Sequence, residues 1–353
     1  MRRGWFGDIP MDAKHKNTGS RSGLGTVWRE WVAPVAVAGV IALSVAGMVE
    51  LAGRFDGRPA KKDNSAKRTM LAAQQKSAPR FVVAVRSPGT AVVVHNLRTG
   101  KIVDETMPPP KGRWYHQVAA APDGTFIVSS FGGQRVGFHR LRLAADGHAT
   151  EFTTLPRAIS GVSAAWSDMA VNADGDRIGY VTYRGTRPRV DVLSLGSGAH
   201  RSWTTSSRGR LGGLSWAGDT LSFVWTPKPA AAAGQVRILN TTKPASDLRT
   251  SRAVLSLPKG SAAAVLSRDG RTVVTGMSSR DGLSLAAFSV ADGRQTRVLR
   301  RFAGSDGLYR LIADRTGRYL LTVSRDGHVH TDSTRDVRGL LGDGDAALTD
   351  LAW

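Results

Sequence analysis

The sequence predicts an all-β protein: a six-bladed β-propeller closed by a C-terminal strand and preceded by one N-terminal transmembrane helix. Three observations predict this: a repeated unit of apolar runs and glycine turns, two chain ends that complement each other, and one long uncharged apolar stretch. The chain has 353 residues, 41% of them hydrophobic, which suits one large domain with appendages. It has no cysteine, so a disulfide framework and a cysteine-based metal or redox site are excluded.

Internal repetition is the strongest signal. One series of segments reads VAAAPDGTFIVSS, AVNADGDRIGYVTY, GLSWAGDTLSFVW, AVLSRDGRTVVTG and LIADRTGRYLLTV. Its turn glycines are Gly124, Gly175, Gly218, Gly270 and Gly317, spaced by about 43 to 52 residues. The flanking runs are rich in Val, Ile, Leu, Phe and Tyr, so each segment is predicted to be two strands joined at a glycine with positive φ.

A second strand pair follows each of these segments, as in AVVVHNLRTGKIVDE, VGFHRLRLAADGHATEF, VDVLSLGSGAHRSW and LAAFSVADGRQTRVL. One unit is therefore a four-stranded antiparallel meander of about 45 to 50 residues. A lone meander leaves two apolar faces in water. Radial stacking buries both faces, which is how a propeller is built.

The two ends of this region complement each other. The first unit lacks a first strand, because residues 80–83 (RFVV) align with the second strand of the next unit, residues 125–128 (TFIV). The segment ALTDLAW, ending at Trp353, resembles a first strand such as LGGLSW. We therefore expect residues 346–352 to pair beside residues 80–86 and to close a ring of six blades, with seven blades as the alternative.

One apolar stretch predicts a membrane anchor at residues 31–50. From Trp31 to Val49 it carries no charge, and 19 residues of helix span roughly 28 Å, close to the thickness of a bilayer core. Residues 1–30 are predicted to be a basic N-terminal tail, 51–78 a flexible linker and 79–353 the propeller. Ser44-Val45-Ala46 resembles a signal-peptidase site, so a cleaved signal is the alternative. Basic residues flank both sides of the helix, and we expect an uncleaved signal anchor with the propeller outside the cytoplasm.

The PDG, NADGDRIGY, SRDGRTVV and DRTGRYLLT turns resemble the WD40-like, or PD40, repeats of TolB-type six-bladed propellers. The resemblance covers about residues 79 to 353. It implies a bacterial, membrane-anchored member of a family of protein- or ligand-binding platforms, often in the cell envelope, with no shared catalytic residues. The Gly-His and Trp-Asp signature of eukaryotic WD40 blades is missing.

Motifs that carry chemistry are missing from the sequence. It contains no GxSxG, HExxH, P-loop or calcium-loop pattern. His328 and His330 share one face of a predicted strand with Asp332, and we interpret this as a solvent-facing strand. No enzymatic activity, cofactor or metal is therefore predicted.

Binding residues are expected on the loops of one propeller face. The loops between second and third strands place at least one cation on each blade, and the loops leading into the first strands add aromatic and basic residues. The predicted binding residues are Arg86, Tyr115, His116, Arg135, Trp166, Arg184, Arg210, Lys228, Arg280, Tyr309, Arg310 and Arg325.

These observations predict a membrane-tethered binding scaffold at the bacterial cell envelope. The formal charge of +21 and the basic loop face fit an unknown protein or an anionic polymer as partner, and the alternative is that both simply reflect an arginine-rich composition. No basic run interleaved with aromatic residues stands out, so nucleic acid is not predicted as a partner. The alternative is a propeller enzyme, a lyase or lactonase-like hydrolase, that uses the axial funnel.

Overall fold

The computed structural model describes residues 78–106, 108–228, 233–258, 261–279, 282–302, 307–324, 329–331 and 348–353. The chain divides into two compact units, Met1–Lys61 and Lys62–Trp353, and every described residue lies in the second. The predicted tail, the predicted transmembrane helix and the predicted linker up to residue 77 lie outside the described residues. Among the residues that are described, no helix is long and apolar enough to cross a membrane.

The described residues form five four-stranded antiparallel sheets and one three-stranded sheet. In spatial order, the first two sheets are β23 (Leu348–Ala352), β1 (Phe81–Arg86), β2 (Ala91–Asn96), β3 (Ile102–Glu105), and β4 (Trp114–Ala120), β5 (Thr125–Gly132), β6 (Arg135–Leu143), β7 (Ala149–Ser160). The next two are β8 (Met169–Val171), β9 (Arg177–Arg184), β10 (Arg187–Ser194), β11 (His200–Thr204), and β12 (Gly209–Ala217), β13 (Thr220–Pro227), β14 (Gln235–Asn240), β15 (Arg252–Ser256). The fifth is β16 (Ala264–Leu266), β17 (Thr272–Ser279), β18 (Gly282–Ser289), β19 (Gln295–Phe302), and the three-stranded sheet is β20 (Leu308–Ala313), β21 (Leu320–Ser324), β22 (Val329–Thr331).

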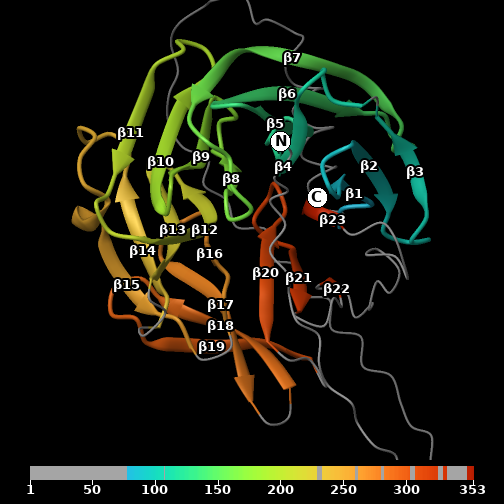
Figure 1. Cartoon of the computed structure of the whole chain (residues 1–353). Helices are drawn as coiled ribbons and strands as arrows, with labels where there is room; N and C mark the ends of the chain where they lie inside the picture. The colour runs from blue at the N-terminus through green and yellow to red at the C-terminus, as the bar shows by residue number, and fades with distance from the viewer. Residues whose placement is uncertain are drawn as a thin grey trace, which may run out of the picture. The chain divides into compact units, whose positions relative to one another are not determined.

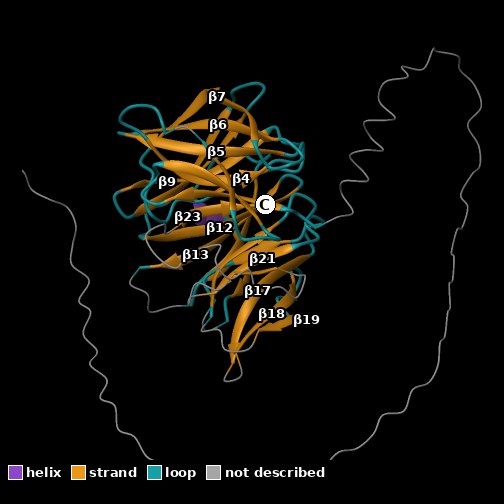
Figure 2. Cartoon of the chain, turned by 90° about the vertical axis from the view of Figure 1, so that its right-hand side faces the viewer, coloured by secondary structure: helices purple, strands orange, loops and turns teal. Residues whose placement is uncertain are grey.

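The sheets are arranged radially, so the predicted all-β propeller is confirmed, with five complete four-stranded blades. Strands β4, β8, β12, β16, β20 and β23 lie nearest the middle of the ring, and β3, β7, β11, β15 and β19 lie at its rim (Figure 1). Each first strand contacts the next one around the axis, from β23 to β4, β8, β12, β16 and β20. Within the described residues, the only helix is the short 3-10 turn η1 (Leu248–Thr250), so the side view shows strands and loops (Figure 2).

Burial falls from the axis to the rim, as radial stacking requires. Strand β1 is buried along its whole centre on both faces, and β5 is buried over six consecutive residues. The outermost strands β3 and β19 are instead largely exposed. Inner strands therefore read as continuous apolar runs, because blades cover both of their faces, whereas rim strands carry polar side chains.

The repeated glycine turns have the backbone conformation that the sequence predicts. The five turn glycines all have positive φ, between +54° and +83°. In the turn after β4, the amide of Gly124 donates to the carbonyl of Ala121 at 3.1 Å, and Asp123 Oδ1 accepts from the amide of Thr125 at 3.0 Å. A residue with a Cβ is strained in this region of φ, so glycine fixes where each strand pair turns.

The C-terminal segment completes the first sheet, as predicted. Strand β23 pairs antiparallel with β1, with Ala352 opposite Val83 and Leu351 opposite Ala84. Leu351 and Trp353 are buried. Both pack in an apolar cluster with residues of β1, β2, β21 and β22, so this segment also seals the contact with the three-stranded sheet.

The apolar core is divided among the contacts between sheets. Six clusters are present in the described residues, and each is shared by two neighbouring sheets. The largest fully buried side chain, Trp203 of β11, packs between the third and fourth sheets with Leu211 and Phe223. No sheet has a core of its own, so each sheet depends on its neighbours for stability.

Substitution of the closing strand is expected to destabilise the whole ring. Leu351→Ala removes a buried side chain from the contact between β1 and β21, and should lower the free energy of unfolding by about 2–5 kcal/mol. Ile102→Ala on rim strand β3, where the side chain is exposed, is the matched control and should change it by less than about 0.5 kcal/mol. Urea denaturation of both variants checks this. Equal stabilities would show that β23 does not close the fold.

Candidate functional site

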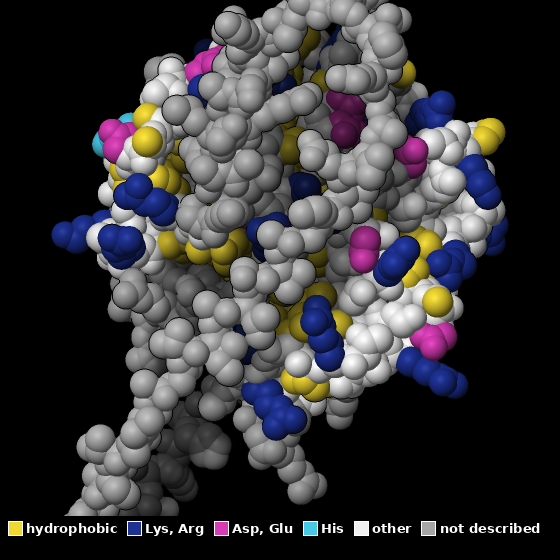
Figure 3. All heavy atoms as spheres, turned by 180° about the vertical axis from the view of Figure 1, so that it is seen from behind, with side chains coloured by type: hydrophobic (Ala, Val, Ile, Leu, Met, Phe, Trp, Pro, Cys, Tyr) yellow, Lys and Arg dark blue, Asp and Glu magenta, His cyan; other side chains and the backbone are white. Residues whose placement is uncertain are grey.

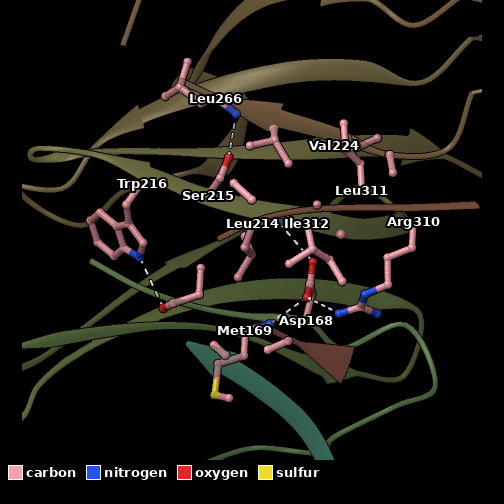
Figure 4. Close-up of a pocket in the computed structure, with 18 of the residues that line it drawn as sticks. Asp168, Met169, Leu214, Ser215, Trp216, Val224, Leu266, Arg310, Leu311 and Ile312 are labelled. Atoms are coloured by element: carbon pink, nitrogen blue, oxygen red, sulfur yellow. Dashed lines mark hydrogen bonds and ion pairs between the residues drawn. The ribbon is translucent and has the colours of Figure 1, made fainter. Parts of the chain in front are cut away.

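A cavity of about 580 Å³ runs along the axis of the propeller. Its walls are the first strands of the blades, including Val118 of β4, Leu214 of β12 and Leu311 of β20. Most of its lining is apolar, and Figure 4 shows Asp168 and Arg310 as the charged side chains that meet within it. Arg210, Arg268, Asp314 and Arg315 also line the cavity, whose size is that of a ligand site.

Arg310 lies between two carboxylates at this axis. Its Nη2 is 3.5 Å from Oδ1 of Asp168, just before β8, and it also pairs with Oδ1 of Asp350 on β23. The side chain of Asp350 is completely buried, and that of Asp168 is nearly so. A quarter of the Arg310 side chain remains accessible, because it faces the cavity. The ion pairs therefore connect three sheets that are distant in sequence.

Backbone amides complete this network. Asp350 Oδ2 accepts from the amide of Val118 at 2.8 Å, and Asp168 Oδ2 accepts from the amide of Leu214 at 3.0 Å. Both amides lie where a β-bulge shifts the register, in β4 between residues 115 and 118 and in β12 between residues 212 and 215. A bulge takes amides out of the ladder, which leaves them to bond a side chain of another sheet. Ser215 Oγ likewise accepts from the amide of Leu266, on the fifth sheet, at 2.8 Å.

The pKa values follow from burial. Burial raises the pKa of Asp350 to about 7, although Arg310 acts in the opposite direction, and Asp168 adds to the increase. Burial also acts to lower the pKa of Arg310, but the carboxylates of Asp350 and Asp168 outweigh it, and its pKa lies above the usual value. Arg310 is therefore the fixed charge of the network, and Asp350 is the group that titrates.

Loss of the cation is expected to destabilise the protein most at high pH. Arg310→Met leaves two carboxylates near each other with no cation, and at pH 8 should lower the free energy of unfolding by about 3–5 kcal/mol. A carboxyl group whose pKa is higher in the folded than in the unfolded state binds more protons when folded. Its contribution to stability therefore falls as pH rises from about 4 through the folded pKa. The loss of unfolding free energy in Arg310→Met should therefore be smaller at pH 5 than at pH 8. Urea denaturation at pH 5 and pH 8 measures this loss.

A second substitution tests the cause of that deficit. Asp350→Asn in the Arg310→Met background removes one of the two negative charges, and should recover part of the stability lost at pH 8 and flatten its pH dependence. Arg297→Met on exposed strand β19 is the control for loss of an arginine. A deficit that is the same at pH 5 and pH 8 would contradict the electrostatic explanation.

Three predicted binding residues, Trp166, Arg210 and Lys228, lie together beside the cavity. The guanidinium of Arg210 lies over the ring of Trp166, 4.2 Å from its centroid, and Nζ of Lys228 lies 4.8 Å from the same centroid. The Trp166 side chain is nevertheless 40% exposed, and that of Tyr309 is 64% exposed. Trp166, Arg210 and Tyr309 also line the cavity. Exposed aromatic side chains at a cavity mouth mark a surface that is able to bind a partner.

Further cations lie on the segments that adjoin Arg210 and Lys228. Arg184 and Arg187 flank the turn between β9 and β10, and Arg208 precedes Arg210. The Arg and Lys residues of this group are all exposed, and none of their side chains makes a hydrogen bond or ion pair with a described residue. We define the Trp166 patch as Trp166, Arg184, Arg187, Arg208, Arg210 and Lys228.

The remaining predicted binding residues have other environments. Arg86 pairs with Glu105 at 2.6 Å, and Arg135 is exposed at the start of β6. Arg280 and Arg325 lie outside the described residues.

Tyr115 and His116 are in the interior rather than on the loop face, because β4 begins one residue earlier, at Trp114. The expected exposure of these two side chains is therefore corrected. Tyr115 packs edge-on against His139 and Phe152.

Two buried histidines pair with buried serines. His116 Nδ1 lies 2.8 Å from Ser163 Oγ, and His139 Nε2 lies 2.8 Å from Ser130 Oγ. Burial lowers the pKa of both histidines to about 4, with Arg310 and Arg113 respectively adding to the effect. All four side chains are buried.

Metal ligands are not grouped in the part of the chain that is described. There, no three or more His, Asp or Glu side chains come together in a way that would hold a metal ion. His328 and Asp332 lie outside the described residues, and the side chain of His330 is not described.

Sequence reasoning missed Asp168 and Asp350. Each immediately precedes an apolar residue of a first strand, in the segments SDMAV and TDLAW. A carboxylate within a strand that is expected to be buried on both faces is itself a signal, because such a charge requires a partner. Its partner, Arg310, occupies a first strand in the segment LYRLIA.

The fold places this chain among the β-propellers. The sequence matches no protein-family model, and it matches no curated protein. Among solved structures, TolB from Acinetobacter baumannii shares 12% sequence identity and a TM-score of 0.51, over 84% of this chain and 74% of that one.

Two other solved structures are similar. A putative TolB from Agrobacterium tumefaciens shares 13% identity and a TM-score of 0.48, over 77% of this chain and 89% of that one. A chain of a nidogen/laminin complex shares 12% identity and a TM-score of 0.49, over 77% and 97%. The similarity to TolB from Acinetobacter baumannii confirms, for the fold, the resemblance that the turn motifs indicated.

Proposed function

We propose that the protein is a membrane-tethered, six-bladed β-propeller scaffold at the bacterial cell envelope that binds an anionic partner on its basic loop face. The observation that carries this proposal is the Trp166 patch, where Arg210 and Lys228 lie over an exposed indole and three more arginines lie on the adjoining segments, all without a carboxylate partner among the described residues. Lys and Arg side chains also spread over the face seen in Figure 3, where they outnumber the acidic ones. The TolB-like fold fits a binding scaffold.

The count of six blades is supported by the apolar clusters. The three-stranded sheet shares one cluster with the fifth sheet and another with the first. It therefore fills the one remaining position between them, and the clusters follow each other around the axis without a gap for the seventh blade of the alternative. On this interpretation the sheet β20-β21-β22 is the sixth blade.

A scaffold role without catalysis is supported by the state of the polar groups near the axis. Both carboxylates of the described network, Asp168 and Asp350, are engaged by Arg310 and by backbone amides. A general acid or base must instead reach a substrate proton. A lyase or lactonase-like hydrolase in the funnel, the alternative, requires a carboxylate or histidine that is free to face its substrate.

The tether is expected to determine where the protein resides. Residues 31–50 contain an uncharged run long enough to span a bilayer, so the full chain should fractionate with membranes and a variant lacking 31–50 should not. With the propeller outside the cytoplasm, protease added to spheroplasts should release it by cleavage in residues 51–78, whereas a cytoplasmic marker stays intact. A propeller that is protected in spheroplasts would contradict the proposed location.

The basic face is tested by reversing its charge. The triple variant is Arg135→Glu, Arg184→Glu and Lys228→Glu. It should bind poly-glutamate or phosphatidylglycerol vesicles about tenfold or more weakly at low salt, because the new carboxylates repel these anionic probes. The control is Arg98→Glu, Lys101→Glu and Arg297→Glu, which reverses three exposed cations elsewhere. Cosedimentation and fluorescence titration measure both. If the wild type binds neither probe, the anionic-partner proposal is wrong.

A further inference from the structure

We propose that the Trp166 patch is the docking site for an acidic protein segment that also carries an apolar side chain. This inference rests on the proposed function, because it assigns the anionic partner a chemical class and a place. Cations at this site engage the carboxylates of the segment, and the apolar side chain lies against Trp166 at the mouth of the axial cavity. The patch spans the third and fourth sheets, which carry the turn 184–187, the loop before β12 and the end of β13.

The patch is held in place by backbone hydrogen bonds. The amide of Gly209 donates to the carbonyl of Thr186 at 3.2 Å, and the amide of Lys228 donates to the carbonyl of Arg208 at 3.1 Å. These bonds connect the three segments that carry the cations. A partner therefore meets cations whose backbone is already fixed, so little conformational entropy is lost on binding.

The loop that carries Trp166 is fixed as well. The hydroxyl of Tyr183 is 3.4 Å from the carbonyl of Trp166, and it accepts from the amide of Leu211 at 3.1 Å. Ser167 Oγ accepts from the amide of Ala164 at 3.0 Å, which closes the turn that presents the indole. The backbone of the Trp166 loop is thus linked through Tyr183 both to its own blade and to β12.

The cations of the patch have no acidic partner among the described residues, whereas some other surface arginines do. Arg86, Arg142 and Arg177 each have an Asp or Glu within 3.6 Å. Arg184, Arg187, Arg208, Arg210 and Lys228 have none among the described residues, although they lie on adjacent segments. Like charges on neighbouring loops repel each other, and an acidic partner removes that repulsion and gains bidentate hydrogen bonds from the arginines.

The apolar component of the site distinguishes a protein segment from an anionic polymer. Val162, on the same loop as Trp166, is 41% exposed, and Trp166 and Tyr309 also present apolar surface to solvent. A phosphate-rich polymer has no group to cover that surface. Tryptophan, tyrosine and arginine are the residue types that dominate binding energy at protein interfaces. The concave mouth also suits an inserted side chain better than a flat bilayer surface.

The experiment uses the full chain and three probes of defined chemistry. These are a short fluorescein-labelled peptide of alternating glutamate and leucine, a matched peptide of alternating glutamate and serine, and phosphatidylglycerol vesicles. The variants are Arg210→Glu with Lys228→Glu, and Trp166→Ala. Arg98→Glu with Lys101→Glu is the control, because it reverses one arginine and one lysine in the exposed turn between β2 and β3.

We expect the wild type to bind the glutamate-leucine peptide about tenfold more tightly than the glutamate-serine peptide. Trp166→Ala should remove most of that preference, and Arg210→Glu with Lys228→Glu should weaken binding of both peptides at least about tenfold. The control should change either dissociation constant less than about twofold. Fluorescence anisotropy at low salt gives the dissociation constants, and circular dichroism confirms that each variant is folded.

The possible failures separate this inference from the proposed function. If the wild type binds vesicles but neither peptide, or if the two patch variants bind the peptides as the control does, the docking site is wrong and the anionic-partner proposal stands. If the two peptides bind equally, and Trp166→Ala does not change their binding, the proposed contact of an apolar side chain with Trp166 is wrong. That result would indicate a polymer-like ligand. If no probe binds, both the proposed function and this inference fail.

Discussion

Pairing between β23 and β1 is the constraint on which the rest of this propeller depends. It brings together residues from opposite ends of the described chain, and it supplies the first sheet with its first strand. The apolar side chains of Leu351 and Trp353 then fill the contact with the three-stranded sheet. Because each cluster of the core is shared between two sheets, opening one contact exposes apolar surface on both sides of it. The stability of the ring is therefore a property of its closure as much as of any single blade.

The charged network at the axis determines the register in which β23 pairs with β1. Hydrophobic contacts are non-directional, and many strands would fill the space beside β1. Asp350 accepts a hydrogen bond from the amide of Val118, which lies at a β-bulge, and it also forms an ion pair with Arg310. A strand shifted by one residue would place this carboxylate on the wrong face and leave Arg310 partly unpaired. The network thus favours one register of the closing strand, at the cost of burying a charge.

Much of the fold was predictable from the sequence, because glycine turns and apolar runs repeat at a regular interval. The turn glycines and the pairing of the C-terminal segment with β1 agree with the prediction. The site was predictable only in part. Trp166, Arg210 and Lys228 were identified one by one, but their assembly depends on the path of the loops, which no periodicity encodes. Tyr115 and His116 were assigned to the loops because the first residue of a strand is difficult to place from sequence, and β4 begins at Trp114, before both of them.

The position of β23 also has a consequence for biosynthesis. About 260 residues separate the end of β1 from the start of its partner strand, so the ribosome makes every other blade before the partner exists. At the usual rate of translation this interval is on the order of 13 to 52 s. Throughout it, the run FVVAV of β1 has an unpaired edge on which a nascent neighbour can add a strand. Incorrect pairing at that edge is therefore possible until β23 has been made.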